Sequence, residues 1–591
     1  MQNNLVPSKI RLIYIAMFCL AGLLVLFALR WQVVEGARFS KIAASRDKDY
    51  VIPALRGTIY AADGSTLAFS EPRYNLFAYY PELVFAETKN LQTRQEFVDK
   101  IAPIVDMTSE QLANWIEDQH SKGSQEIKIA NNLTIEQQQK ITSLARDKDK
   151  GLLLGYTTKY TSMRFYPEGR LAAQALGLVT ITDTGKNIGQ GGLEAAWDGN
   201  LEPRIGFISG ELDAKGNAVG TAAEKTIEAK RGSSIYTTID KKLQAIAQEK
   251  LKWGIENFGA ESASTVIMDP KTGEILAMAN YPDYDPNVRE EKDPNVYGNI
   301  AVSEPYEIGS VGKIFTLSAA IDQGVVTPDS VIIQGHEGCE KIHQDLEPVC
   351  THDHLPQPPM PIKDAFALSD NIYFLHLAQL MTKENFSDYL YKFGMGAPSG
   401  IDISGESYGL LKDWQRWNVA DQAAYSYGHS YEANAVQTAS GVAAVANYGV
   451  RMQPHIVSKV VESDGKETVF KQIPLEQVIK KETTLQMDAM MHVIYENNIF
   501  YWEHEYDDLR DYNIAMKSGT ALIPYRDRPG YSNDINASYV GYDASPDRSF
   551  VMLVHLKRPQ GDLASFNARL VWLETFKAMK DYMGVRRIGE F

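Results

Sequence analysis

Ser310 and Lys313 are the residues whose types and spacing most directly predict covalent chemistry in this chain. They lie three residues apart in the segment 307–316, and apolar residues at helical spacing follow them. Residues at i and i+3 share one face of a helix, so the lysine nitrogen can reach the serine hydroxyl and, when neutral, accept its proton. A serine in the first turn also lies near free backbone N–H groups and the positive end of the helix dipole. The segment therefore predicts a serine nucleophile with a lysine base.

The same Ser-x-x-Lys spacing also occurs at Ser45–Lys48 and at Ser463–Lys466. The second of these lies in a Ser-Asp-Gly-Lys run, which is typical of a hairpin turn. Because the spacing alone is not specific, a catalytic interpretation of Ser310 depends on further groups elsewhere in the chain.

A Ser-Asp-Asn motif supplies two such groups. Ser369, Asp370 and Asn371 separate two helical tracts, residues 362–368 and 372–380. Side chains at such a helix junction can face a cleft, so we expect this motif to lie beside the Ser310 helix.

A third motif, Lys517–Thr520, continues an alternating strand that begins at Asn513. An edge strand beside the nucleophile could bind an extended substrate through its backbone, and its lysine could hold an anionic group. Lys271–Gly273 matches the same motif, but it lies at the tip of a predicted hairpin, where a turn explains the glycine.

The elements around these motifs predict one α+β domain over residues 231–591. Strands are expected at 235–239, in a hairpin at 265–279 and at the C-terminal end, and the three motifs fall among helices between them. Strands at both ends with helices between favour a mainly antiparallel sheet.

The N-terminal segment predicts a membrane anchor. Leu12–Leu29 is an uninterrupted apolar run of about the length that spans a bilayer, and basic residues flank it. No small-residue cleavage site follows, so the run differs from a signal peptide. We expect a cytoplasmic tail at 1–11, a transmembrane helix at 12–30 and the remainder on the outer side of the membrane; a buried core helix is the alternative.

Residues 31–230 predict a stalk or docking module without a catalytic group set. Two strands are expected around the turn at Asp63–Gly64, and helical tracts at 91–115 and 134–145. Arg56 is interpreted as a buried arginine that ties strands together. The 591-residue length allows several domains, and the net charge of −16 argues against a nucleic-acid binder.

Ser-x-x-Lys, Ser-Asp-Asn and Lys-Thr-Gly together are the signature of penicillin-binding proteins and class A β-lactamases. All three motif types occur here in that order, the third as Lys-Ser-Gly, and the chain resembles the class B penicillin-binding proteins well beyond them. The further segments that carry the resemblance are Arg56–Ile59, Arg164–Pro167, Gly192–Glu194, Thr238–Asp240, Asp269–Glu274 and Tyr425–Gly428.

The resemblance implies a membrane-anchored peptidoglycan D,D-transpeptidase that acts on stem peptides, is acylated by β-lactams and uses no cofactor. Its implied architecture is an elongated pedestal (dimerisation-type) domain at 31–230 and a transpeptidase domain, similar to serine β-lactamases, at 231–591. It further implies a polytopic glycan polymerase of the SEDS type, and other wall-synthesis proteins, as partners. A division role is favoured over elongation because the chain is compact and shows no extra C-terminal module.

The resemblance also assigns roles to the motif residues. Ser310 would be the acylated nucleophile, Lys313 its base and Ser369 a proton relay toward the leaving amine. Asn371 would bind the donor amide, while Lys517, Ser518 and Thr520 would bind its terminal carboxylate beside Gly519. The backbone N–H groups of Ser310 and Thr520 would form the oxyanion hole.

Three positions depart from the family pattern, and one of them is Ile314, which stands where the family often has proline. Gly312 stands where a bulky residue is usual, and glycine inside a helix predicts a looser first turn. Asp370 stands where class B members usually have a small neutral residue, and its charge could hold Lys313 protonated.

Three rival functions share some of these features. A β-lactamase would also use the Ser-Lys pair and an aspartate at position 370, but the anchor, the pedestal and the missing deacylation loop oppose it. A β-lactam sensor would have a larger membrane or cytoplasmic part. A catalytically weak scaffold of a wall-synthesis complex stays open, and covalent penicillin labelling discriminates it.

Cys339 and Cys350 are close in sequence between the first two motifs. With His352 and His354 they could form a tetrahedral zinc site, although the spacing matches no standard zinc module. A disulfide closing a short loop is favoured, because disulfides persist outside the cytoplasm.

Overall fold

The computed structural model describes residues 8–30, 47–146, 153–182, 186–211, 225–288, 293–344, 347–500, 505–525, 527–528, 530–560 and 564–590. Most of the expected cytoplasmic tail, Ser45 of the Ser45–Lys48 pair and the first part of the expected pedestal, residues 31–46, lie outside these ranges. The chain divides into two compact units, which are described separately: residues 1–55 with 203–231, and residues 56–202 with 232–591.

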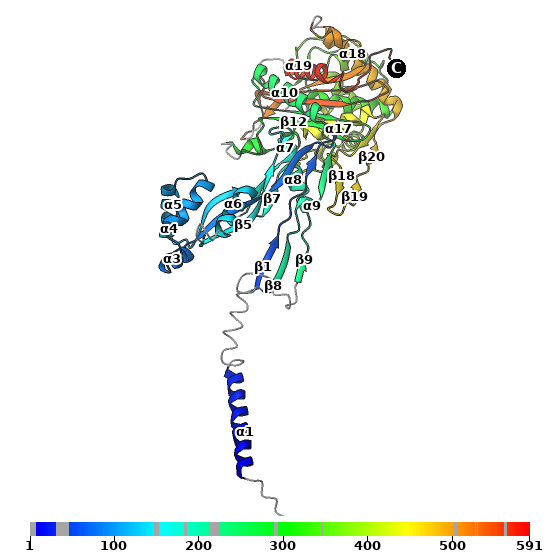
Figure 1. Ribbon diagram of the computed structural model, residues 1–591. Helices are drawn as coiled ribbons and strands as arrows, with labels where there is room; N and C mark the ends of the chain where they lie inside the picture. The colour runs from blue at the N-terminus through cyan, green and yellow to red at the C-terminus, as the bar shows by residue number, and fades with distance from the viewer. Residues whose placement is uncertain are drawn as a thin grey trace, which may run out of the picture. The chain divides into compact units, whose positions relative to one another are not determined.

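The first unit contains the expected apolar helix. Helix α1 spans Ser8–Leu29, and within the described part of the chain it is the one helix long and apolar enough to cross a membrane (Figure 1). The same unit contains a three-stranded antiparallel sheet in the order β1-β8-β9. Its strands are β1 (Asp47–Ile52), β8 (Gly206–Glu211) and β9 (Lys225–Ile227).

The second unit begins with a small α/β layer that has a hydrophobic core of its own. The long strand β3 (Thr66–Tyr79) pairs with β4 (Glu126–Leu133) and β5 (Tyr156–Phe165). Its helices are α3 (Tyr80–Thr88), α4 (Arg94–Ile101), α5 (Ser109–Ser121) and α6 (Ile135–Arg146). Buried residues such as Phe97, Leu112 and Ile141 join the helices to the strands.

The expected helical tract at 91–115 is wrong as one helix, because the structure has two helices joined by a 3-10 turn. Helix α4 ends before the turn that contains Pro103, which cannot donate a backbone hydrogen bond. Thr108 then begins α5 with a capping box, in which its side chain accepts from the Gln111 N–H and Gln111 binds back. The apolar periodicity of the sequence continues across the break between α4 and α5, so the pattern alone did not indicate that the first helix ends there.

A second sheet runs across the expected domain boundary near Arg231. Its strands follow the order β19-β18-β10-β2-β3-β4, with β2 (Ile59–Tyr60) parallel to β10 (Ser234–Thr237). Strands β18 (Val457–Val461) and β19 (Glu467–Val469) complete the other side. Residues far apart in the sequence therefore share one sheet.

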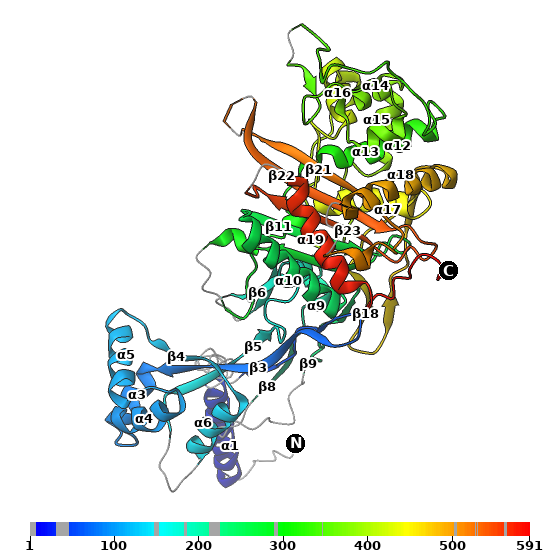
Figure 2. The ribbon, with the colours of Figure 1, turned by 90° about the horizontal axis from the view of Figure 1, so that it is seen from above.

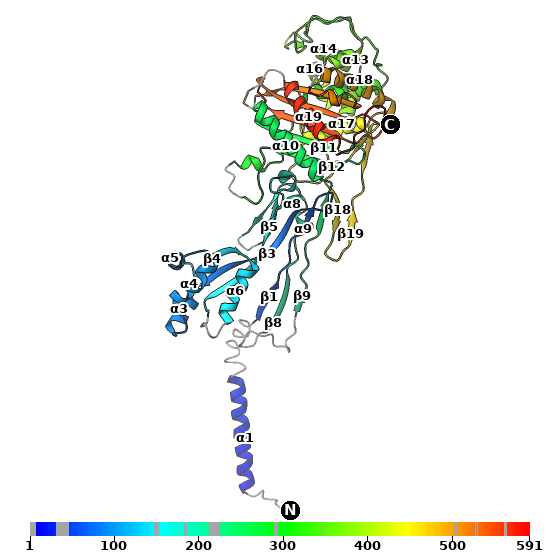
Figure 3. The same ribbon diagram turned by 45° about the horizontal axis from the view of Figure 1, so that its top comes forward.

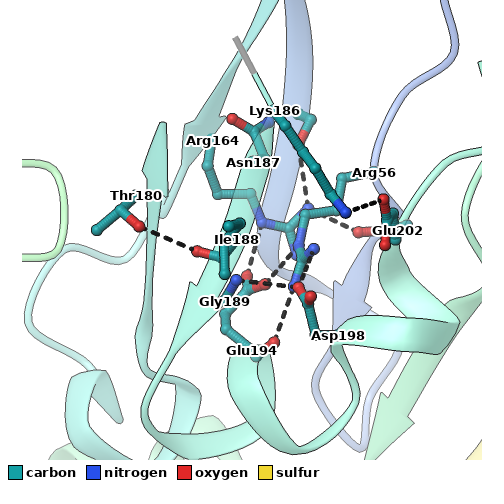
Figure 4. Close-up of polar contacts among 12 residues, drawn as sticks. Arg56, Arg164, Thr180, Lys186, Asn187, Ile188, Gly189, Glu194, Asp198 and Glu202 are labelled. Atoms are coloured by element: carbon teal, nitrogen blue, oxygen red, sulfur yellow. Dashed lines mark hydrogen bonds and ion pairs between the residues drawn. The ribbon is translucent and has the colours of Figure 1, made fainter. Parts of the chain in front are cut away.

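Arg56, at the start of the second unit, is buried as expected and lies in an ionic cluster (Figure 4). Its Nε donates to Glu194 Oε2 at 2.7 Å, and Arg164 Nε donates to the other oxygen of the same carboxylate at 2.7 Å. Arg56 Nη1 also binds Asp198 at 2.6 Å. Burial alone would lower the pKa of Arg56, but the two carboxylates outweigh this effect and raise it. The cluster joins α8 (Gly192–Ala196) and α9 (Asp198–Leu201) to the strands.

The expected antiparallel sheet of the C-terminal part is confirmed, but the strand expected at 235–239 is β10 of the second sheet and does not belong to it. Five strands follow the order β12-β11-β23-β22-β21, which leaves β21 at one edge (Figure 2). They are β12 (Ile275–Tyr281), β11 (Ser262–Met268), β23 (Val551–Lys557), β22 (Tyr531–Asp543) and β21 (Ile514–Pro524). Helices α10 (Lys241–Phe258) and α19 (Ala564–Met579) pack together against this sheet. The buried helix α17 (Ala435–Ala446) packs against the three inner strands.

Another group of helices gathers beside this sheet (Figure 3). They are α12 (Gly312–Asp322), α13 (Ile362–Ala367), α14 (Asn371–Gln379), α15 (Lys383–Lys392), α16 (Val419–Ser426) and α18 (Lys481–Phe500). Helix α12 contacts α14, α15 and α18, and α18 contacts the edge strand β21. This packing brings the three motifs, which span more than two hundred residues of sequence, to one place.

Candidate active site

The Ser310 segment folds as a short 3-10 turn that runs into α12. The turn spans Gly309–Val311, so the α-helix proper begins two residues after Ser310. Ser310 is partly exposed and Lys313 is fully buried. Lys313 Nζ lies 3.1 Å from Ser310 Oγ, which confirms that the i, i+3 spacing brings the two groups together.

Gly309 allows this turn to approach the edge strand. Its φ of +57° is a left-handed conformation that L side chains rarely adopt. A Cβ at this position would lie 2.4 Å from the Thr520 carbonyl oxygen. The absence of a side chain at Gly309 therefore lets the nucleophile turn lie directly against β21.

Ser369 and Asp370 form the predicted junction between α13 and α14. Ser369 has a φ of +59°, the position at a helix C-terminus where glycine is common. Asp370 then caps α14, since its Oδ1 accepts from the N–H groups of Ile372 and Tyr373 at 2.8 and 3.0 Å. These two turns direct Ser369 and Asn371 toward Lys313.

The Lys313 amine lies among four oxygen atoms. Its Nζ is 2.5 Å from the Ser369 carbonyl and 2.8 Å from Asn371 Oδ1, which can only accept hydrogen bonds. The other two oxygens belong to the hydroxyls of Ser310 at 3.1 Å and Ser369 at 3.2 Å. A neutral amine has two N–H bonds and one lone pair. When its N–H bonds point at the two carbonyl oxygens, the lone pair is left for a hydroxyl, as a general base requires.

Lys517 connects the third motif to this group. It is buried on β21, and its Nζ lies 3.0 Å from Ser369 Oγ and 3.1 Å from the Ser518 carbonyl. Ser518 is half-buried and Thr520 is exposed on the same edge strand. The hydroxyl of Ser369 therefore lies between the two lysines, and the strand beyond it presents hydroxyls to a ligand.

The two lysines have shifted pKa values. Burial is the main cause that lowers the pKa of Lys313 well below its ordinary value, and the charge of Lys517 adds to it. Burial also lowers the pKa of Lys517 to about 7. The charge of Asp370 raises the pKa of Lys313, which is the direction expected from the sequence, but it is the smallest of the three effects and the net shift is downward.

We expect acylation to have a bell-shaped pH profile. Acidification protonates Lys313, which then cannot accept a proton, and raising the pH through about 7 removes the positive charge of Lys517. The second-order rate of acylation by a fluorescent penicillin, measured between about pH 5 and 9, checks this. Lys517→Arg keeps its charge over that range and should lose the alkaline limb. A wild-type rate that climbs steadily to the alkaline end would contradict the assignment.

At Ser369 we expect stability and activity to favour different residues, because the hydroxyl serves acylation while the left-handed backbone favours glycine. Relief of its left-handed backbone by Ser369→Gly should raise the free energy of unfolding by about 1 kcal/mol, while the loss of the hydroxyl slows acylation. Ser369→Ala removes the same hydroxyl without relieving the backbone, so it should slow acylation with no gain in stability. Chemical denaturation and penicillin labelling measure the two effects. If Ser369→Gly is less stable than Ser369→Ala, the left-handed backbone at this position does not cost stability and the prediction is wrong.

Gly312 does not loosen the first turn as expected. Gly312 is buried, and a Cβ there would lie 2.6 Å from the Tyr431 hydroxyl and 2.7 Å from Gly428 Cα. The glycine therefore permits close packing of α12 against the segment that follows α16, and the helix start is held by its neighbours.

The other sequence matches lie outside this group. The Lys271–Gly273 match forms the turn between β11 and β12, as expected. Lys271 Nζ donates there to the carbonyl of Asp547 and does not approach Ser310. Ser463 and Lys466 are exposed at the tip of the β18–β19 hairpin.

Cys339 and Cys350 form the favoured disulfide. Of the two candidate histidines, His354 has its Nδ1 3.4 Å from Cys339 Sγ, and within the described residues His352 does not join the cluster. Sulfurs joined in a disulfide are not the thiolates that bind zinc.

Sequence reasoning missed His336, whose Nε2 lies 2.8 Å from Asp370 Oδ2. No periodicity marked it, because it stands in an irregular proline-rich segment. A buried aspartate that departs from the family pattern was the available signal, since such a group needs a partner.

Comparison with known proteins agrees with this geometry. The model of the penicillin-binding protein transpeptidase domain matches residues 263–571, and the model of the penicillin-binding protein dimerisation domain matches residues 51–237. A buried lysine within reach of a serine hydroxyl is an arrangement that fits serine acyl transfer, in which a base takes the proton of the hydroxyl. The chain belongs to the class B penicillin-binding proteins and is a transpeptidase.

Curated relatives match across most of the chain. Stage V sporulation protein D of Bacillus subtilis is 28% identical over 543 residues, covering 90% of this chain and 79% of the relative. The probable peptidoglycan D,D-transpeptidase PenA of Neisseria meningitidis is 28% identical, covering 86% and 81%.

Solved structures share the fold. Penicillin-binding protein 2X of Streptococcus thermophilus has a TM-score of 0.73 at 22% identity, covering 91% of this chain and 81% of that one. Penicillin-binding protein 3 of Mycobacterium tuberculosis in complex with ampicillin has a TM-score of 0.65 at 23% identity, covering 92% and 98%.

Proposed function

We propose that this chain is a membrane-anchored serine D,D-transpeptidase that cross-links peptidoglycan stem peptides through an acyl-enzyme on Ser310. The observation that carries the proposal is the position of the Lys313 amine, which has two carbonyl acceptors for its N–H bonds and a nucleophile hydroxyl at 3.1 Å. Relatives named peptidoglycan D,D-transpeptidases supply the substrate class.

The proposed acylation begins when Ser310 Oγ attacks the penultimate carbonyl of the donor peptide and gives its proton to Lys313. The resulting oxyanion accepts from the backbone N–H groups of Ser310 and Thr520. The C–N bond then breaks, and the leaving amine takes a proton relayed by Ser369. An amine of a second stem peptide attacks the ester and releases Ser310.

The other motif residues hold the donor. Asn371 donates one Nδ2 hydrogen to the Cys350 carbonyl, and its second Nδ2 hydrogen can bind the donor amide. Ser518 and Thr520 bind the terminal carboxylate, and the positive potential of Lys517 attracts it. A β-lactam presents the same carboxylate and a strained amide, so it would acylate the same serine.

The decisive experiment is the mass of a proteolytic peptide. Incubation with ampicillin should add one intact drug molecule to the peptide that contains Ser310, because ring opening transfers the whole molecule. Absence of any adduct would support the alternative, a catalytically weak scaffold of a wall-synthesis complex.

The membrane topology forms a second part of the proposal. Helix α1 would be a single-pass anchor in the plasma or inner membrane, with the catalytic unit on the outer side. Its apolar length and the basic residues before it support this orientation. Protease added to spheroplasts should digest the penicillin-labelled part, whereas a protected label would reverse the orientation.

A partner polymerase forms the third part. We expect the purified chain to make no glycan strands from lipid-linked disaccharide, because neither matched domain is a glycan polymerase. Addition of a polytopic SEDS-type polymerase should restore strand synthesis and allow cross-linking. Gel analysis of labelled glycan checks both steps, and polymer formed by the purified chain alone would contradict the expectation.

We propose a division role for this transpeptidase. Division and elongation enzymes share the motifs, so the location of the protein in the cell decides between the two roles. A fluorescent fusion concentrated at the septum would agree with the division role, and uniform labelling of the side wall would indicate elongation.

A further inference from the structure

An arm, of which the structure describes residues 336–344 and 347–357, lies beside the Ser-Asp-Asn motif. Its base is closed by two backbone hydrogen bonds of 2.9 Å between His336 and Gln357. Further along, β14 (Cys339–Glu340) pairs with β15 (Val349–Cys350), and the disulfide joins the same two strands. The arm is therefore cross-linked at its base and along its length.

Three hydrogen bonds connect the arm to α14 and to its capping residue Asp370. His336 Nε2 binds Asp370 Oδ2 at 2.8 Å, between side chains that are only 3% and 2% exposed. The Cys350 carbonyl accepts from Asn371 Nδ2 at 2.9 Å. A third, half-exposed pair joins Glu340 to His376 one turn further along the helix.

The hydrogen bonds of the two ring nitrogens fix the tautomer of His336. The Gly338 N–H donates to His336 Nδ1 at 3.1 Å, so this nitrogen is the acceptor. The ring hydrogen must then be on Nε2, which donates it to Asp370. Because Asp370 Oδ1 already caps α14, both oxygens of its carboxylate are held and the side chain cannot rotate.

The Cys350 carbonyl fixes the amide of Asn371 in turn. A carbonyl accepts only from the NH₂ group of an amide, so Nδ2 must face the arm and Oδ1 must face Lys313. In the reverse orientation the NH₂ group would face the lysine, where it could not accept an N–H bond. The orientation of this amide thus decides whether the Lys313 lone pair is available to Ser310.

We propose that His336 is a positioning residue for the lysine base: with the Cys350 carbonyl, it holds Asp370 and Asn371 so that Asn371 Oδ1 takes one Lys313 N–H. The proposal rests on the proposed function, because it assigns the arm a role in the acylation of Ser310. His336 acts through the motif and does not touch the reacting atoms.

The test separates binding from chemistry in the full-length protein. Stopped-flow labelling with a fluorescent penicillin gives the dissociation constant of the initial complex and the rate constant of acylation. His336→Leu should lower the acylation rate constant by about tenfold or more, because it removes a buried hydrogen bond to a charged group. The dissociation constant should change by less than about threefold, because the carboxylate site lies on β21. His336→Gln can place an amide N–H near Asp370 and should recover most of the rate.

His352→Leu is the matched control, since this exposed histidine lies on the same arm. An unchanged rate constant in His336→Leu, an equal loss in His352→Leu, or no recovery in His336→Gln would overturn the proposal. Wild-type protein that is not acylated at all would instead overturn the proposed function, so the two failures are distinguishable.

A second pair of variants covers the case in which His336→Leu does not fold. Asp370→Ser keeps a side chain able to cap α14 and removes the carboxylate that His336 binds. In this background, His336→Leu should change the acylation rate constant by less than about threefold, because the two positions act as a pair. A loss of about tenfold or more in this background would show that His336 acts independently of Asp370 and would reject the mechanism.

Discussion

Replacement of Ser310 by alanine is expected to abolish covalent penicillin labelling, lowering the acylation rate by at least about a thousandfold. In the proposed mechanism the covalent bond forms at Ser310 Oγ, which alanine lacks, while the partly exposed hydroxyl contributes little to packing. The melting temperature should therefore change little. Gel fluorescence after incubation with a labelled penicillin, together with a thermal melt, measures both effects.

Ser463→Ala is the control for the Ser310 prediction. It removes a serine from the same Ser-x-x-Lys spacing, but this serine is exposed at a hairpin tip. Labelling should stay at the wild-type level. Labelling that survives Ser310→Ala and disappears in Ser463→Ala would identify Ser463, and not Ser310, as the acylated serine.

Glu194→Ala is expected to cause the largest loss of stability, about 3–5 kcal/mol. The carboxylate receives one hydrogen bond from Arg56 and one from Arg164, and all three side chains are at most 2% exposed. Its removal leaves two buried guanidinium groups that have each lost their hydrogen bond to this carboxylate. Urea unfolding followed by intrinsic fluorescence measures the effect, which is a large part of the free energy of a typical domain.

Glu202→Ala is the matched control for this prediction. It removes the same charge from the same region (Figure 4), but the Glu202–Lys186 ion pair is 36% and 52% exposed. Exposed pairs contribute little because water screens both charges. The unfolding midpoint should therefore stay near the wild-type value, and equal losses in the two variants would mean that the buried cluster has no special role.

The chemistry of the site could be predicted wherever it followed from local geometry. Ser310 and Lys313 share a helix face by spacing alone, and the Ser-Asp-Asn motif falls between two tracts of helical periodicity. The strand that carries Lys517 was visible from alternation. Its edge position, however, depends on pairing with strands elsewhere in the chain.

Other features could not be predicted because they join residues whose positions no local pattern fixes. The contact of His336 with Asp370 spans 34 residues, and an irregular proline-rich segment gives no direction to its side chains. Arg56 was expected to be buried, but Glu194 lies 138 residues away. The close packing around Gly312 depends on Tyr431, so the sequence indicated only a weak helix start.

The strand order β18-β10-β2-β3 has a practical consequence for anyone who wants a smaller, soluble version of this enzyme. A fragment beginning at residue 232 would keep every motif residue and yet lose β2, the neighbour of β10. An unpaired strand edge would then face solvent and invite aggregation. Inhibitor screens and crystallisation are better served by a polypeptide that omits only α1, because residues before position 232 complete the sheet that contains β10 and β18.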